Sequence, residues 1–147
     1  MLYSARGRSN KLWNNYDQNL FLPVIEIPPN ALIVVVDDDV FERMGACGMF
    51  LDAGYRVLEA GNADEALHFF EANADIRVLF TDVSMPGSMS GSDLANQVAE
   101  RWPNVGIIIA SGRPRPHKLP LSMLFHDKPY EPAVVLRQAR EMTTQLG

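Results

Sequence analysis

Residues 32–39 read Leu-Ile-Val-Val-Val-Asp-Asp-Asp, a run of five aliphatic side chains that ends in three carboxylates. β-Branched residues favour an extended backbone, and an unbroken apolar run of this length is typical of a strand covered on both faces. Such strands occur in parallel sheets, where binding groups gather beyond the carboxyl ends of the strands. The stretch therefore predicts a buried parallel strand that brings aspartates to one edge of a sheet.

Helix-like and strand-like segments alternate along the rest of the chain. We expect strands over 55–60, 76–81, 105–110 and 123–126, and helices over 40–52, from Ala63 onward, over 93–102 and over 132–145. The residues that share the apolar face of the first helix are Val40, Met44, Cys47 and Leu51. Strands that alternate with helices of this length form βαβ units. The predicted fold is α/β, a flavodoxin-like doubly wound sheet of five parallel strands in the order 2-1-3-4-5.

The composition excludes several classes of protein. The chain has 147 residues, a formal net charge of −5 and a single cysteine, Cys47. Its length fits one domain, and its acidity argues against DNA binding, which needs a basic stripe. One cysteine cannot form an intrachain disulfide or a multi-cysteine metal site, so we expect a cytoplasmic protein. No apolar run approaches the roughly 18 residues that span a membrane, so no membrane insertion is expected.

The first 30 residues differ in composition from the rest. They hold three basic and two acidic residues and end in Pro-Pro-Asn, whereas the acidic excess lies in residues 31–147. We therefore divide the chain into an N-terminal extension or linker over 1–30 and one domain over 31–147. Termini fray unless they are tied down, so a flexible extension is expected. Trp13, Tyr16 and Leu20 nevertheless lie at i, i+3 and i+7, a spacing that allows a short docking helix.

Polar side chains follow four of the predicted strands. Asp37 and Asp38 follow the first strand and Asp82 the third, while Ser111 and Lys128 follow the fourth and fifth. Carboxylates this close together repel each other and need a cation between them, and an all-oxygen set favours Mg²⁺. A carboxylate beside Mg²⁺, a hydroxyl and a lysine could accept a phosphoryl group as an acyl phosphate.

Four motifs in this order resemble those of the response-regulator receiver domains of two-component signalling. They are Val-Val-Asp-Asp at 35–38, Thr-Asp-Val-Ser-Met-Pro-Gly at 81–87, Ala-Ser-Gly at 110–112 and Asp-Lys-Pro-Tyr at 127–130. The resemblance covers residues 31–146 and implies that Asp82 is the phosphoacceptor, while Ser111, as the switch hydroxyl, and Lys128 bind the phosphoryl group. The groups that it implies as Mg²⁺ ligands are the carboxylates of Asp37, Asp38 and Asp82 and the backbone carbonyl of Ser84.

The resemblance assigns supporting roles to several other residues. Ser84 and Arg113, two residues beyond the acceptor and the switch hydroxyl, are expected to tune the lifetime of the phosphoryl group. The bond between Lys128 and Pro129 is often cis in such domains. Asp39 matches none of these roles, and we expect it to cap the first helix.

Two positions depart from the usual receiver pattern. The aromatic switch position on the fifth strand is Phe125, which lacks the hydroxyl of the common tyrosine. Pro114, Pro116 and Pro120 lie where the fourth helix is expected, over about 114–122, and proline removes donors and restricts the residue before it. We predict that this helix is absent or shorter than two turns, and we expect at most a weak or phosphorylation-dependent dimer.

The resemblance implies a stand-alone receiver, similar to those of hybrid histidine kinases, because the loop over 85–91 is one residue longer than the common form. It implies phosphotransfer to Asp82 from a phosphohistidine on a sensor histidine kinase or histidine phosphotransfer protein. Such a domain is not an enzyme, although it takes part in phosphotransfer and can dephosphorylate itself. The chain ends one helix after Lys128, so we expect no output domain, and signalling through phosphorylation-dependent contact with an unknown downstream protein.

Two other interpretations stay open. One is a receiver-like scaffold that is not phosphorylated, against which the complete set of site residues argues. The other is a haloacid-dehalogenase-like phosphatase, because Asp37 and Asp39 imitate its Asp-x-Asp start, with Asp37 as nucleophile and Asp39 as general acid and base. Phe41 stands where that family has a small residue, and neither a cap domain nor a downstream acidic pair is evident.

Overall fold

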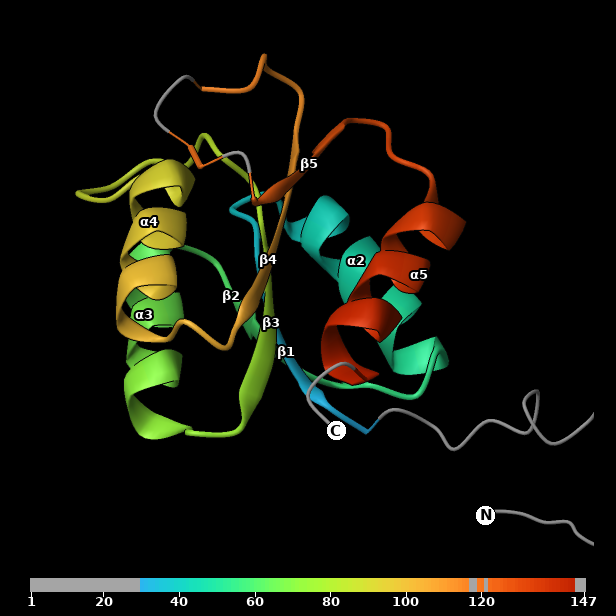
Figure 1. Ribbon diagram of the computed structural model, residues 1–147. Coiled ribbons are helices and arrows are strands. Elements are labelled where there is room, and N and C mark those ends of the chain that lie inside the picture. The colour runs from blue at the N-terminus through green and yellow to red at the C-terminus, as the bar shows by residue number, and fades with distance from the viewer. Residues whose placement is uncertain (1–29, 117–118, 121, 145–147) are drawn as a thin grey trace, which may run out of the picture.

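The computed structural model describes residues 30–116, 119–120 and 122–144. These residues form a sheet with helices on both faces (Figure 1). Five parallel strands lie in the order β2-β1-β3-β4-β5. They are β1 (Leu32–Val36), β2 (Arg56–Ala60), β3 (Ile76–Thr81), β4 (Gly106–Ser111) and β5 (Leu124–Asp127). The helices in the described residues are α2 (Val40–Asp52), α3 (Ala63–Ala72), α4 (Gly91–Arg101) and α5 (Pro132–Thr144). The predicted flavodoxin-like α/β fold and its strand order are confirmed.

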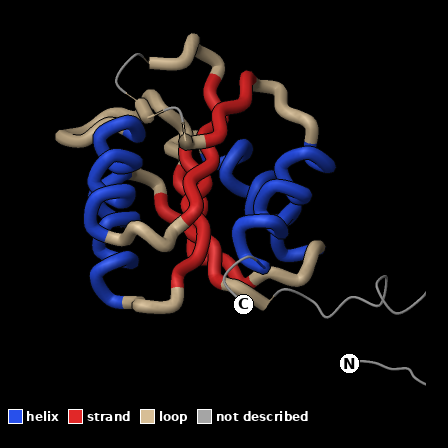
Figure 2. Tube along the Cα trace, in the orientation of Figure 1, coloured by secondary structure: helices blue, strands red, loops and turns tan. Residues whose placement is uncertain are grey.

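The strand β1 lies between β2 and β3 and is buried along its whole length, as its aliphatic run predicts. Leu32, Val34 and Val36 belong to the core shared with α3 and α4, whereas Ile33 and Val35 belong to the core shared with α2 and α5. Figure 2 shows the strands as one layer between these two pairs of helices. Because both faces are covered, the strand carries no polar side chain before its carboxyl end.

Side-chain caps set where the helices begin. Asp39 accepts hydrogen bonds from the backbone N–H groups of Phe41 and Glu42 at 2.9 and 3.0 Å, which confirms its expected role as the cap of α2. At α4, Ser90 and Asp93 form a capping box, in which the Asp93 N–H donates to Ser90 Oγ at 3.1 Å. This helix therefore begins at Gly91, earlier than the predicted start at Asp93.

The apolar face predicted for α2 is mostly exposed to solvent. Three of its four residues are exposed: Val40 (51%), Met44 (60%) and Leu51 (55%). The residues that α2 buries are Ala46, Cys47 and Phe50. The Phe50 ring packs edge-on against Phe80 of β3, with the ring centroids 5.3 Å apart. The helix thus turns Phe50 and its neighbours Ala46 and Cys47 toward the sheet, and most of the predicted face stays exposed.

No helix occurs among the described residues between β4 and β5, which agrees with the prediction for 114–122. His117, Lys118 and Leu121 in this span lie outside the described residues. The guanidinium of Arg115 donates to the backbone carbonyls of Pro120 and Met123 and lies 5.7 Å from the centroid of the Phe125 ring. One side chain therefore braces the proline-rich connection in place of a helix.

The extension predicted over 1–30 lies outside the described residues except for Asn30, and so does the docking helix considered around Trp13. The last helix is described to Thr144, so the predicted helical residue 145 also lies outside. Within the described ranges, no helix has both the length and the apolar content that crossing a membrane requires.

Candidate functional site

Three carboxylates meet at the carboxyl edge of the sheet. Asp37 and Asp38 follow β1 and Asp82 follows β3, and these strands are neighbours whose register pairs Val36 with Thr81. One carboxylate oxygen from each aspartate lies within 4.8 Å of those from the other two. Three carboxylate oxygens at this spacing suit a hard divalent cation such as Mg²⁺, which prefers oxygen ligands.

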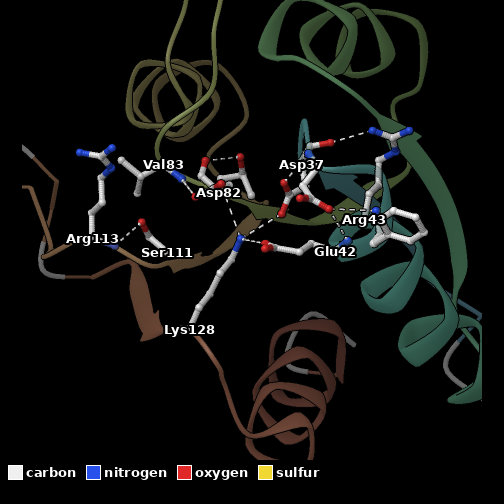
Figure 3. Close-up of polar contacts among 11 residues, drawn as sticks. Asp37, Glu42, Arg43, Asp82, Val83, Ser111, Arg113 and Lys128 are labelled. Carbon is white, nitrogen blue, oxygen red and sulfur yellow. Dashed lines mark hydrogen bonds and ion pairs between the residues drawn. The ribbon is translucent and has the colours of Figure 1, made fainter.

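The backbone orients two of these carboxylates. The N–H group of Asp39 donates to Asp37 Oδ1 at 2.9 Å, and the N–H group of Val83 donates to Asp82 Oδ1 at 2.7 Å. Their second oxygens, Asp37 Oδ2 and Asp82 Oδ2, face Lys128 (Figure 3). Each of the two aspartates therefore has one oxygen held by the backbone and one directed to the centre of the site.

Lys128 links the end of β5 to these aspartates. Its Nζ lies 3.0 Å from Asp37 Oδ2 and 3.5 Å from Asp82 Oδ2, and it also contacts Glu42 Oε1. Burial by itself would lower the pKa of Lys128, but hydrogen bonds with Glu42 and Asp37 and the charge of Asp82 raise that pKa above its ordinary value. The bond between Lys128 and Pro129 is cis. The ammonium group therefore stays charged and is shared among three carboxylates.

Two residues of α2 that the sequence did not single out also contact the site. Glu42 is one partner of Lys128, and Arg43 Nη1 donates to the backbone carbonyl of Asp37 at 2.8 Å. Arg43 Nε also donates to Glu59 of β2 at 2.9 Å, so this side chain ties the segment after β1 to the neighbouring strand. Both residues lie in the first turn of α2, directly after the cap at Asp39. That position is the one feature of the sequence that places them near the site.

The remaining predicted residues lie around this centre. Ser111 is buried at the end of β4, and its Oγ accepts a hydrogen bond from the Arg113 N–H at 3.1 Å. The Lys128 N–H donates to the Ser111 carbonyl at 2.9 Å, which fixes the two strand ends side by side. Phe125 is half-buried against the core shared with α3 and α4, while Ser84 and Arg113 are exposed.

A cavity of about 560 Å³ adjoins the aspartates between α2 and the segment that leads into α5. Asp37, Asp82 and Lys128 line one part of it, and apolar side chains such as Met49 and Phe80 line another. Charges beside apolar walls interact more strongly than they do in water. The cavity therefore favours tight coupling between Lys128 and the carboxylates around it.

Alkaline pH is expected to destabilise the folded domain from about pH 9 upward. Burial raises the pKa of the Cys47 thiol from 9.0 to about 11, and the pKa of Lys128 is also raised. Above about pH 9 the unfolded thiol loses its proton while the folded thiol keeps it, so the free energy of unfolding falls as pH rises. Lys128 lowers the free energy of unfolding further once the pH exceeds the pKa of this lysine in the unfolded chain.

Urea denaturation at a series of pH values measures this effect. Cys47→Ala should remove the early part of the decline, between about pH 9 and the ordinary lysine pKa of about 10.4, and leave the later part. An identical decline in wild type and Cys47→Ala would show that the thiol does not contribute.

The comparisons with known proteins point in one direction. The family model described as "Response regulator receiver domain" matches residues 33–119. The hydrogenase transcriptional regulatory protein HoxA of Cupriavidus necator is 35% identical over 82 residues, which are 56% of this chain and 16% of that protein. The sensor kinase CckA of Brucella abortus is 30% identical over 88 residues, which are 59% of this chain and 9% of that protein. The chain thus spans only a small part of the length of these curated relatives.

Solved structures show the same fold. A response regulator receiver domain protein from Clostridium thermocellum superposes with a TM-score of 0.71 at 24% identity, covering 79% of this chain and 96% of that one. The receiver domain of the hybrid histidine kinase CckA superposes with a TM-score of 0.66 at 26% identity, covering 78% of this chain and 100% of that one.

Proposed function

The chain belongs to the family of response regulator receiver domains, and from this premise we propose that it accepts a phosphoryl group on Asp82. The donor is a phosphohistidine of a sensor histidine kinase or histidine phosphotransfer protein, and the output is a changed affinity for a protein partner. The observation that carries this proposal is the meeting of Asp37, Asp38 and Asp82 within 4.8 Å, with Lys128 directed at two of them.

In the proposed reaction, Oδ2 of Asp82 attacks the phosphorus atom while the phosphorus–nitrogen bond to the donor imidazole breaks. The electron pair of that bond leaves with the imidazole nitrogen, and Asp82 becomes an acyl phosphate. Oδ2 is the nucleophile because Oδ1 already accepts the Val83 N–H. Mg²⁺ held by Asp37, Asp38, Asp82 and the Ser84 carbonyl would offset negative charge on the transferring oxygens.

Lys128 and Ser111 respond to the new charge. Phosphorylation adds roughly 1.5–2 negative charges at Asp82, and Lys128 shifts its contacts toward them. The Ser111 hydroxyl, which now accepts the Arg113 N–H, turns to donate to a phosphoryl oxygen. The turn of Ser111 also shifts the connection between β4 and β5, which Arg115 braces. Phe125 moves with it, because its ring lies against the Arg115 guanidinium. Ser84 and Arg113, both exposed at the rim, set the access of water and hence the phosphoryl lifetime.

Incubation with Mg²⁺ and acetyl phosphate, followed by measurement of the intact mass, tests this proposal. A receiver gains the mass of one phosphoryl group, and chelation of Mg²⁺ prevents the gain. A scaffold that is not phosphorylated keeps its mass under both conditions, and that result would reject the proposal.

Glu42→Gln is expected to speed phosphorylation by up to about fivefold. Glu42 holds Lys128 in competition with Asp82, and its side chain is half exposed, so the pair contributes at most about 1 kcal/mol. Without that carboxylate, Lys128 is freer to meet the incoming phosphoryl group. The initial rate of adduct formation from acetyl phosphate measures the effect. Glu71→Gln is the matched control, because Glu71 pairs with Arg101 away from the site. Equal rates in both variants would show that Glu42 does not restrain Lys128.

A further inference from the structure

The strongly exposed large hydrophobic side chains of the described residues all lie on α2. They are Val40, Phe41, Met44 and Leu51, with exposed fractions of 51%, 83%, 60% and 55%. Val40, Met44 and Leu51 follow one line along the helix, and Phe41 lies beside it. We call these four residues the outer stripe of α2. Gly48 falls within this stripe, and a Cβ there would meet no atom within 4 Å, so another backbone can approach closely.

The outer stripe lies beside the residues that pack α2 onto the sheet, and it stays exposed. That packing is made by Ala46, Cys47 and Phe50, and Cys47 lies at the edge of the outer stripe. A surface helix of a globular domain needs one apolar face for its core, with polar residues on the other. Large apolar side chains that stay exposed beyond the buried face therefore indicate a contact surface.

The chain itself carries a segment whose pattern suits this stripe. Trp13, Tyr16 and Leu20 repeat at the spacing of one helix face, and further apolar residues follow as far as Ile27. We propose that residues 13–27 pack against the outer stripe of α2 in the same chain. The docking helix that the sequence allows around Trp13 then has its partner.

The point of attachment places this segment within reach. The Asn30 N–H donates to the Gly54 carbonyl at 3.1 Å, and Arg56 Nε donates to the Asn30 carbonyl at 3.0 Å. The chain therefore enters the domain beside the end of α2. This helix of 13 residues is about 20 Å long, and the 15 residues 13–27 span that length in any mixture of helical and extended backbone.

Charge selects the direction in which the segment lies. Arg6, Arg8 and Lys11 precede Trp13, whereas the start of α2 carries the exposed carboxylates of Asp39 and Glu42. With Trp13 near the start of α2 and Ile27 near its end, the basic residues come opposite the acidic ones. Complementary charge of this kind fixes register and orientation at an interface.

Fluorescence of Trp13 tests the proposal in the full chain. Trp102→Phe leaves Trp13 as the only tryptophan, and we expect its emission to be shielded from acrylamide. Adding Met44→Asp, or separately Leu51→Asp, should raise the quenching severalfold and shift the emission to longer wavelength. His68→Asp, which introduces the same charge on the exposed side of α3, should leave both unchanged. Far-UV circular dichroism confirms that each variant is folded.

Three results would overturn the proposal. Trp13 could be fully quenchable in the background variant, or its shielding could survive both substitutions in the stripe. Shielding that increases with protein concentration would assign the stripe to a second copy of the chain. If Trp13 is unshielded in the Trp102→Phe background and Met44→Asp also slows transfer from a phosphohistidine donor, the stripe is the docking site of the donor.

Discussion

Asp82→Asn is expected to abolish phosphorylation by acetyl phosphate. The amide has no negatively charged oxygen to attack phosphorus, and it removes one of the three carboxylates that face the proposed cation. The rest of the site should persist, because the Val83 N–H can donate to the amide oxygen as it now donates to Asp82 Oδ1. Intact mass after incubation with Mg²⁺ and acetyl phosphate is the measurement, and the adduct seen in wild type should be absent.

Asp39→Asn is the matched control for this substitution. Asp39 lies next to the site but caps α2, and asparagine caps helices about as well as aspartate. The adduct should therefore form on Asp39→Asn at a rate close to that of wild type. A full-size adduct on Asp82→Asn would contradict the assignment of Asp82. Loss of the adduct on Asp39→Asn would instead favour phosphatase-like chemistry that uses Asp37 and Asp39.

Gly91→Ala is expected to cost about 2–4 kcal/mol of folding free energy. A Cβ at Gly91 would lie 1.7 Å from the Asp82 carbonyl oxygen and 2.7 Å from its carbon, and both are backbone atoms that cannot turn aside. The Gly91 N–H also donates to the Val83 carbonyl at 2.8 Å, so α4 begins directly against the segment that carries the acceptor. Such overpacking forces backbone shifts, which commonly cost 1–3 kcal/mol and sometimes more. The midpoint of urea denaturation should fall accordingly.

Gly45→Ala provides the comparison. Gly45 lies within α2, where a Cβ would meet no atom within 4 Å, and alanine favours helix by roughly 1 kcal/mol over glycine. Its denaturation midpoint should equal or exceed that of wild type. If Gly91→Ala had the same midpoint as Gly45→Ala, α4 would not be packed against the acceptor segment as described.

Much of the fold follows from features that act locally. The β-branched aliphatic run of β1 favours a strand buried on both faces, and Asp39 caps the helix that follows it. The meeting of Asp37, Asp82 and Lys128 could be anticipated because parallel strands place their carboxyl ends at one edge. Once the strands are located in the sequence, their parallel order predicts which residues gather at the carboxyl edge of the sheet.

Other features depend on choices that local patterns leave open. The periodicity of α2 leaves open which of its apolar residues face the sheet, and the packing of Phe50 against Phe80 of β3 decides it. Ser90 and Asp93 are both good caps, and because Ser90 is the one that caps α4, the helix begins two residues before its predicted start. Glu42 meets Lys128 across 86 positions of sequence, and such a partner is visible only once the fold is known.

The most direct test of the central claim is to locate the phosphoryl group. Wild-type protein is incubated with acetyl phosphate, with and without Mg²⁺, then reduced with borohydride to trap the acyl phosphate and mapped by tandem mass spectrometry. The account predicts a single modified residue, Asp82, and modification only when Mg²⁺ is present. Modification at Asp37, or no modification at any residue, would contradict it.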